Sequence, residues 1–389
     1  MFAGFLPGLH PNSIGAIMAE VFPGAQWLPI ALMLLLGAHV SLEFFASIFM
    51  GVPEGETAVG ALPGVRMMME GRGREAAVVV AFSVVAATII AIAATPLATA
   101  AMPALMHFVE PNTLWVLAVA VLLLVGSERG KTTGSGALRE RLAAIAKAFV
   151  VFALAATLGH LAFSMQIKDA LFPMFVGFFT IPGIMLSGHG KMKEVRQEEG
   201  KVMVDAGLLA PILLGVLLGG LADLVPGIST PAQIAVFASL ILPIDEAKKF
   251  LALVSSIAAS HAAFAITAAA TIGKARVGAV AIANQIEPIT SANVLGLLFA
   301  FALAVGFGAF VLIAAAKYAS ERMKDLDFGL AGKILAAYLV LAVYFVSGWI
   351  GIIVLLTAAA IGSLPVLWGV RRTHVMGGII GPSMMRLLV

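Results

Sequence analysis

The chain has 389 residues, of which 61% are hydrophobic and only 12% are charged, and its formal net charge is +3. The mean hydropathy of +1.05 excludes an ordinary soluble domain, and several runs reach the roughly 20 apolar residues that cross a bilayer. Because there is no cysteine, disulfides, thiol catalysis and cysteine-based metal sites are also excluded. The composition predicts an all-α, polytopic protein of the cell membrane, with its short basic loops facing the cytoplasm.

The first apolar stretch, residues 3–24, is broken by the dipeptide Pro7-Gly8 and again by Pro11. A Pro-Gly step ends a helix or makes a tight turn, and a proline suits the first position of a new helix. The residue before Pro11 would then lie at the helix cap, and the next N–H groups would lack intrahelical partners. We therefore expect a re-entrant hairpin whose helix N-terminus binds an anion. Its candidate substrate-binding residues are Pro7, Gly8, His10, Asn12 and Ser13.

A strong span follows at residues 26–50 and contains His39 and Glu43. Residues four apart lie on one face of a helix, and ionisable residues inside a membrane are costly and usually face a cavity or a partner. The two side chains could relay a proton or hold a coupling cation. The alternative is a hydrogen-bonded pair that only closes a helix interface, and the sequence leaves both interpretations open.

Further spans are expected as far as residue 222, separated by charged loops or polar turns. They are 76–104, 112–126, 142–165, 170–187 and 202–222, with a break in the fourth at Ile181-Pro182-Gly183. The basic loops mark the cytoplasmic side, so the turn at 106–111 is predicted to lie outside the cell. Asp205, early in the last of these spans, is a further candidate ligand for a coupling ion.

A second Pro-Gly motif, Pro226-Gly227, is followed by another proline at Pro231 and predicts a second hairpin over residues 224–244. Ser229 or Thr230 would cap the helix that starts at Pro231. The candidate substrate-binding residues of this hairpin are Pro226, Gly227, Ser229, Thr230 and Gln233.

The rest of the chain is predicted to form spans at both ends of two basic loops. A span at 246–271 contains His261, a third candidate for coupling-ion binding. Residues 277–316 are long enough for two crossings that turn near Glu287-Pro288, and spans at 334–348 and 349–369 complete about ten to twelve crossings.

The two motifs define an internal repeat, since their Pro-Gly steps are 219 residues apart and a span with a mid-helix histidine follows each, His39 in one half and His261 in the other. The predicted halves are 1–201 and 202–389. Broken backbone in corresponding positions of two halves is the sequence pointer to a transporter's binding site, because a membrane tolerates it only where it is buried or lines a wet cavity. Ordinary proline kinks without a ligand are the alternative, and the sequence leaves the repeats either parallel or inverted.

Several segments along the chain resemble the signatures of one membrane-protein family. They are Phe5-Leu6-Pro7-Gly8-Leu9-His10-Pro11-Asn12, Phe49-Met50-Gly51-Val52-Pro53-Glu54-Gly55-Glu56-Thr57-Ala58, Leu62-Pro63-Gly64-Val65-Arg66, Gly71-Arg72-Gly73-Arg74-Glu75-Ala76, Gly177-Phe178-Phe179-Thr180-Ile181-Pro182-Gly183 and Arg371-Arg372-Thr373-His374-Val375-Met376-Gly377. In this order they resemble the archaeal branch of the TctA family, the large permease subunit of tripartite tricarboxylate transporters. The longer bacterial members read Pro-Gly-Leu-Gly-Pro-Thr where this chain has His10 and Asn12.

The resemblance implies a multi-span permease for small carboxylates that is driven by an ion gradient. It also implies two accessory partners, an extracytoplasmic binding protein and a small membrane subunit. The paired Pro-Gly hairpins resemble those of bacterial polyprenyl-phosphate translocases as well, whose substrate is a lipid phosphate.

We therefore expect a secondary active transporter of a small organic anion, a di- or tricarboxylate, coupled to a proton or Na⁺ gradient, in the cell membrane and open to homo-oligomerisation. The sequence has no His-Glu-x-x-His, Gly-x-Ser-x-Gly or Walker motif, so we expect no enzyme, no cofactor beyond the coupling ion and no metal site. One alternative is a polyprenyl-phosphate translocase. The other is an intramembrane enzyme that acts on a lipid phosphate and uses His39 or His10 as acid or base.

Overall fold

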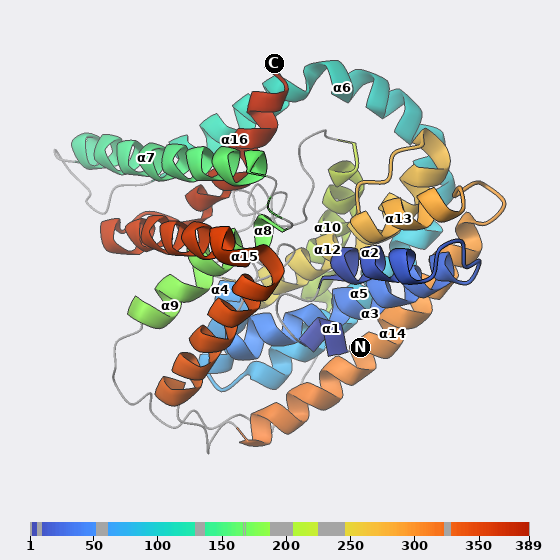
Figure 1. The fold of residues 1–389 in the computed structure, drawn as a ribbon, viewed down its shortest axis with the longest axis horizontal. Coiled ribbons are helices and arrows are strands. Elements are labelled where there is room, and N and C mark those ends of the chain that lie inside the picture. Colours follow the sequence, from blue (N-terminus) through green and yellow to red (C-terminus); the bar gives the residue numbers. More distant parts are fainter. Residues whose placement is uncertain are drawn as a thin grey trace.

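A computed structural model of the chain describes residues 2–5, 10–51, 61–128, 137–165, 167, 169–186, 205–224, 246–322 and 328–388. Every regular element within these ranges is a helix (Figure 1). Seven of the described helices are long and apolar enough to cross a membrane, which confirms the predicted class of polytopic helical membrane protein. These are Leu28–Met50, Gly73–Ala93, Thr95–Gly126, Leu138–Ser164, Ala247–Ile272, Val294–Arg322 and Gly332–Trp368.

The elements follow one another along the chain with short connections. In the first half they are α1 (Phe2–Phe5), α2 (Pro11–Val21), α3 (Leu28–Phe45), η1 (Ala46–Met50), α4 (Ala61–Met69), α5 (Gly73–Ala93), α6 (Thr95–Gly126), α7 (Ala137–Ser164), α8 (Leu171–Phe175), η2 (Val176–Thr180) and α9 (Ile181–Leu186). In the second half they are η3 (Ala206–Leu208), α10 (Leu209–Ala222), α12 (Ala247–Ile272), α13 (Gly278–Ile286), α14 (Val294–Arg322), α15 (Phe328–Trp368), η5 (Arg372–Met376) and α16 (Gly377–Arg386).

The helices pack into two groups. In the first group α12 is buried along its whole hydrophobic window and packs against α5 and α10, while α3 packs along α14. In the second group α15 packs against η2, α8 and α9, and α7 packs against α16 and η5. Figure 1 shows α6 as a long arc, and this helix contacts α12 of the first group and α7 and α16 of the second. Each predicted half, 1–201 and 202–389, therefore contributes helices to both groups.

Small residues bring the central helices close together. Gly215 and Gly219 of α10 lie against Ser256 and Ser260 of α12, and the Ser260 hydroxyl donates to the Gly215 carbonyl at 3.2 Å. Such contacts are typical of membrane helices, because small side chains let backbones approach and hydroxyls then bond across the interface. The close fit matters for the site, because α10 ends beside an acidic residue that pairs with α12.

Helix α6 corrects one prediction. The sequence predicted two spans separated by an outer turn at 106–111, but the helix runs without interruption through Pro103 and Pro111, and the break lies at Ala94 instead. Asn112 and Thr113 donate side-chain hydrogen bonds to carbonyls of the preceding turn, Phe108 and Val109, at 2.9 and 3.0 Å. Prolines are tolerated in membrane helices when side chains satisfy backbone groups in this way.

The stretch 277–316 corrects a second prediction, that of two crossings. The turn does lie at Glu287, the C-terminal cap of α13, but α13 has only 9 residues. At about 1.5 Å per residue it is less than half as long as the roughly 30 Å hydrocarbon layer. Only α14 in this stretch is long enough to cross.

The expected division of the last apolar stretch is confirmed. Gly348 interrupts α15 with φ 69° and ψ −168°, so the helix consists of two arms that meet where spans 334–348 and 349–369 were predicted to meet (Figure 1). The break expected at Ile181-Pro182-Gly183 is milder, because the helix continues through the π-helical segment η2 into α9.

The number of crossings expected, ten to twelve, exceeds the seven long helices of the described ranges. The two hairpins predicted from the Pro-Gly motifs stay predictions. The turn at Pro7-Gly8 and almost all of 224–244 lie outside the described residues.

Candidate functional site

The described part of the first motif forms the start of α2 as predicted. His10 is the N-cap residue, with extended backbone, and Pro11 is the first residue of the helix. The His10 Nδ1 atom accepts a hydrogen bond from the Asn12 N–H at 3.3 Å, which satisfies one of the N–H groups that a helix start leaves unpaired. The His10 ring also packs edge-on against the ring of His39, with centroids 5.2 Å apart. The motif therefore lies directly against α3.

His39 and Glu43 share one face of α3, as their spacing predicted. The His39 Nε2 and Glu43 Oε2 atoms are 3.6 Å apart, and the two side chains are 1% and 0% exposed. Charged groups removed from water to this extent are costly unless they are paired. Together with the ring of His10, they form a continuous polar path from the first motif into the core.

The second half contains a corresponding pair, His261 and Asp223. The His261 Nε2 atom of α12 lies 3.5 Å from Asp223 Oδ1, and the side chains are 1% and 0% exposed. Asp223 is the C-cap residue of α10 and comes two residues before the second motif starts at Val225. The sequence suggested only that Asp223 caps or braces the hairpin, and its pairing with His261 was missed.

Asn12 has a contact that the sequence did not indicate. Its Oδ1 atom accepts the N–H of Ala279 at 2.9 Å, so the side chain caps the start of α13 from across the fold. A side chain at Gly278 would collide with Asn12, which makes glycine necessary there. The predicted role of Asn12 in binding substrate stays a prediction, and the Ser13 side chain lies outside the description.

The remaining predicted substrate-binding residues lie in the ranges that the structure leaves undescribed. They are Pro7, Gly8, Pro226, Gly227, Ser229, Thr230 and Gln233. The two buried histidine–carboxylate pairs flank these ranges along the chain, one beside His10 and the other at Asp223. The candidate site is therefore defined by the pairs.

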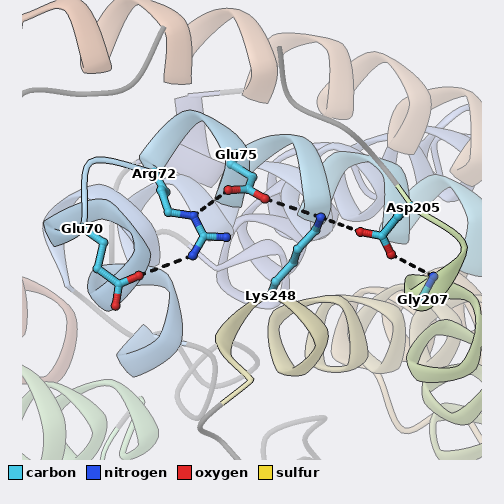
Figure 2. Close-up of polar contacts among 6 residues, drawn as sticks. All are labelled: Glu70, Arg72, Glu75, Asp205, Gly207 and Lys248. Carbon is cyan, nitrogen blue, oxygen red and sulfur yellow. Dashed lines mark hydrogen bonds and ion pairs between the residues drawn. The ribbon is translucent and has the colours of Figure 1, made fainter. Parts of the chain in front are cut away.

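Asp205, the fourth candidate for coupling-ion binding, lies elsewhere. It caps η3 through the Gly207 N–H at 2.8 Å, and its carboxylate lies 2.8 Å from Lys248 Nζ, with a side chain 57% exposed (Figure 2). Lys248 also reaches Glu75 at 3.4 Å, and Glu75 accepts from Arg72 at 2.7 Å. The hydrogen bond from Lys248 and then that from Gly207 lower the pKa of Asp205.

These contacts give the Asp205 charge a structural function where the helices end. Asp205 and Asp223 lie at opposite ends of α10, a helix of 14 residues and so about 20 Å long. Asp205 is therefore far from the His261 pair. Its role as an ion ligand stays a prediction.

Two surface hollows lie apart from the buried pairs. One, of about 360 Å³, is lined by charged residues of this network, including Arg66, Asp205 and Lys248. The other, of about 440 Å³, is an apolar groove between α3 and α14. We place the candidate site at the pairs rather than at these hollows, because buried ionisable groups are costly in a membrane and are retained for function.

A third buried pair was missed by the sequence analysis. Glu128 Oε1 lies 2.7 Å from His374 Nε2 and accepts the Arg371 N–H at 2.8 Å, which ties the end of α6 to η5. Burial raises the pKa of Glu128, but the hydrogen bonds from His374 and Arg371 outweigh it, so the pKa is lowered overall. The only available signal was the segment from Arg371 to Gly377 that carries part of the family resemblance.

The buried pairs and the long apolar helices define a polytopic helical protein of the cell membrane, with ionisable groups in its core. The model of the tripartite tricarboxylate transporter TctA family matches residues 1–377, and the chain belongs to this family. It is also similar to an uncharacterized protein of Methanocaldococcus jannaschii, with 25% identity over 394 residues, 99% of this chain and 95% of the relative. No solved structure matches the chain.

Proposed function

We propose that the chain is an ion-coupled permease for a small organic anion, a di- or tricarboxylate. Membership of the TctA family supports a transporter rather than an enzyme. The observation that carries the proposal is the placement of two buried histidine–carboxylate pairs, one in each half, beside the ends of the two Pro-Gly segments. In transporters such segments present helix N-termini to anionic substrates.

In this proposal the pairs bind the coupling ion. A carboxylate next to an imidazole can hold one proton between them, and the same oxygens suit a sodium ion. Histidine changes charge close to neutral pH, so a proton taken up at His39 or His261 would change the local charge by one unit. Because His10 touches both the first motif and His39, that change would reach the proposed anion site directly.

The test is uptake by purified protein in liposomes, with a panel of labelled carboxylates and with pH and Na⁺ gradients imposed separately. We expect Glu43→Gln and His39→Gln to lose gradient-driven uptake while still exchanging substrate across the membrane. His107→Gln is the matched control, because this histidine lies on the exposed face of α6. If both variants fold and keep wild-type gradient dependence, the pairs are structural and the coupling site lies elsewhere.

The same preparation distinguishes the alternative functions. Flipping of a polyprenyl phosphate without uptake of any carboxylate would replace the proposal with a lipid-carrier translocase. Turnover of a lipid phosphate in detergent, where no gradient exists, would show an enzyme.

We also propose that the permease works with accessory subunits, because the family takes its name from a tripartite transporter. The expected partners are an extracytoplasmic binding protein and a small membrane subunit. Co-purification of a small membrane protein encoded beside this chain, together with uptake that requires it, would support this. Full uptake by the permease alone would contradict it.

A further inference from the structure

The loop between α12 and α13, residues 273–277, is held at both ends. Lys274 forms an ion pair with Glu110 of α6 at 2.7 Å. Beyond the loop, the Ala279 N–H is bonded to Asn12 of the first motif, and Val277 is buried. The loop therefore has a defined position beside the start of α2.

Arg276 lies in the middle of this loop and is largely withdrawn from water. Burial lowers the pKa of its guanidinium, and the carboxylates of Asp223 and Glu110 raise it. An arginine stays charged even when burial lowers its pKa. The loop therefore holds a permanent positive charge within electrostatic reach of Asp223, next to the second motif, and a few residues from the contact with Asn12 in the first.

This position brings the surroundings of the two motifs together. The motifs are 219 residues apart in the sequence, yet the same short loop is bonded to Asn12 on one side and interacts with Asp223 on the other. Asp223 has a second partner in His261, so its charge is shared and does not belong to Arg276 alone.

We propose that Arg276 binds one carboxylate group of the transported anion and so sets the preference for substrates with two or more carboxylates. This inference rests on the proposed function. The planar guanidinium presents two parallel N–H groups that match a carboxylate, and partial removal from water strengthens that interaction. The helix N-terminus that starts at Pro11 would remain available for another carboxylate of the same molecule.

The competing interpretation is that Arg276 only neutralises Asp223. The two interpretations differ in what they predict for substrate affinity. A counter-ion would affect folding and maximal rate equally for every substrate, whereas a binding residue affects KM, and does so most strongly for substrates with more than one carboxylate.

The experiment compares Arg276→Gln, Arg276→Lys and Lys274→Gln in liposomes, with succinate, citrate and acetate as the probes. Lys274→Gln is the matched control, because it removes the same charge two residues away from a side chain paired with Glu110. Loss of a charge-assisted bond predicts a rise in KM for succinate and citrate of about ten- to a hundredfold in Arg276→Gln. We expect a smaller rise in Arg276→Lys, little change for acetate and no change in the control.

The double variant Asp223→Asn/Arg276→Gln keeps the test decisive if the single variant folds poorly, because it removes both charges. If Arg276 is only a counter-ion, substrate affinity returns to the wild-type value in the double variant, and the inference is overturned. It is equally overturned if Arg276→Gln folds and keeps every KM within about twofold. If the wild-type protein transports no carboxylate at all, it is the proposed function that fails.

Discussion

The contact between α10 and α12 allows a sharp prediction for Gly219→Ala. A Cβ atom added at Gly219 would collide with the Ser260 hydroxyl and would lie 2.9 Å from both the His261 N and the Ile257 O atoms. The hydroxyl is already bonded to the Ser256 carbonyl at 2.6 Å, and the other two atoms belong to the backbone of α12. The collision can therefore be relieved only if the two helices move apart.

The expected cost follows from two opposing terms. Overpacking a close helix contact costs about 1–3 kcal/mol, whereas replacing glycine by alanine inside a helix gains up to about 1 kcal/mol. The control Gly306→Ala has only the gain, because a Cβ atom added at this position of α14 would meet nothing within 4 Å. The two variants should thus differ in unfolding free energy by about 1–3 kcal/mol, with Gly219→Ala the less stable.

The assay is equilibrium unfolding in mixed detergent micelles, with uptake measured on the same preparations. Because α10 ends at Asp223, its displacement should also lengthen the 3.5 Å contact with His261 and reduce gradient-driven uptake. Adding Ser260→Ala should recover part of the stability, since it removes the hydroxyl but not the backbone contacts. Equal stability of Gly219→Ala and Gly306→Ala would refute the reasoning.

Three further predictions concern single residues. Gly348→Ala should cost about 1–3 kcal/mol, measured by the same unfolding assay, because φ 69° with ψ −168° is open almost only to glycine; an unchanged midpoint would count against a fixed bend in α15. Glu128→Gln should lower stability at neutral pH, and because the folded pKa of Glu128 is lowered, the difference from the wild type should persist above the unfolded value of about 4.3 and shrink as the pH falls through the folded value; a pH-independent difference would show that its charge is unimportant. Asp205→Asn should leave the Na⁺ and pH dependence of uptake unchanged, because its carboxylate is exposed and bonded to Lys248; loss of ion dependence would restore Asp205 as a coupling residue.

The sequence by itself determined the features that depend on neighbouring residues. The apolar runs determined the helical membrane class, and the order His10, Pro11 determined where α2 begins. The spacing of four placed His39 and Glu43 on one face of α3. In each case the backbone geometry of a few consecutive residues decides the outcome.

Only the tertiary structure decided which distant segments meet. The Asn12 contact with Ala279 joins residues 267 apart, and that of Glu128 with His374 joins residues 246 apart. Neither partner has a local pattern that names the other. The continuity of α6 through two prolines and the pairing of Asp223 with His261 were likewise decided by packing, because the free energy of a buried polar group depends on the partner that folding brings to it.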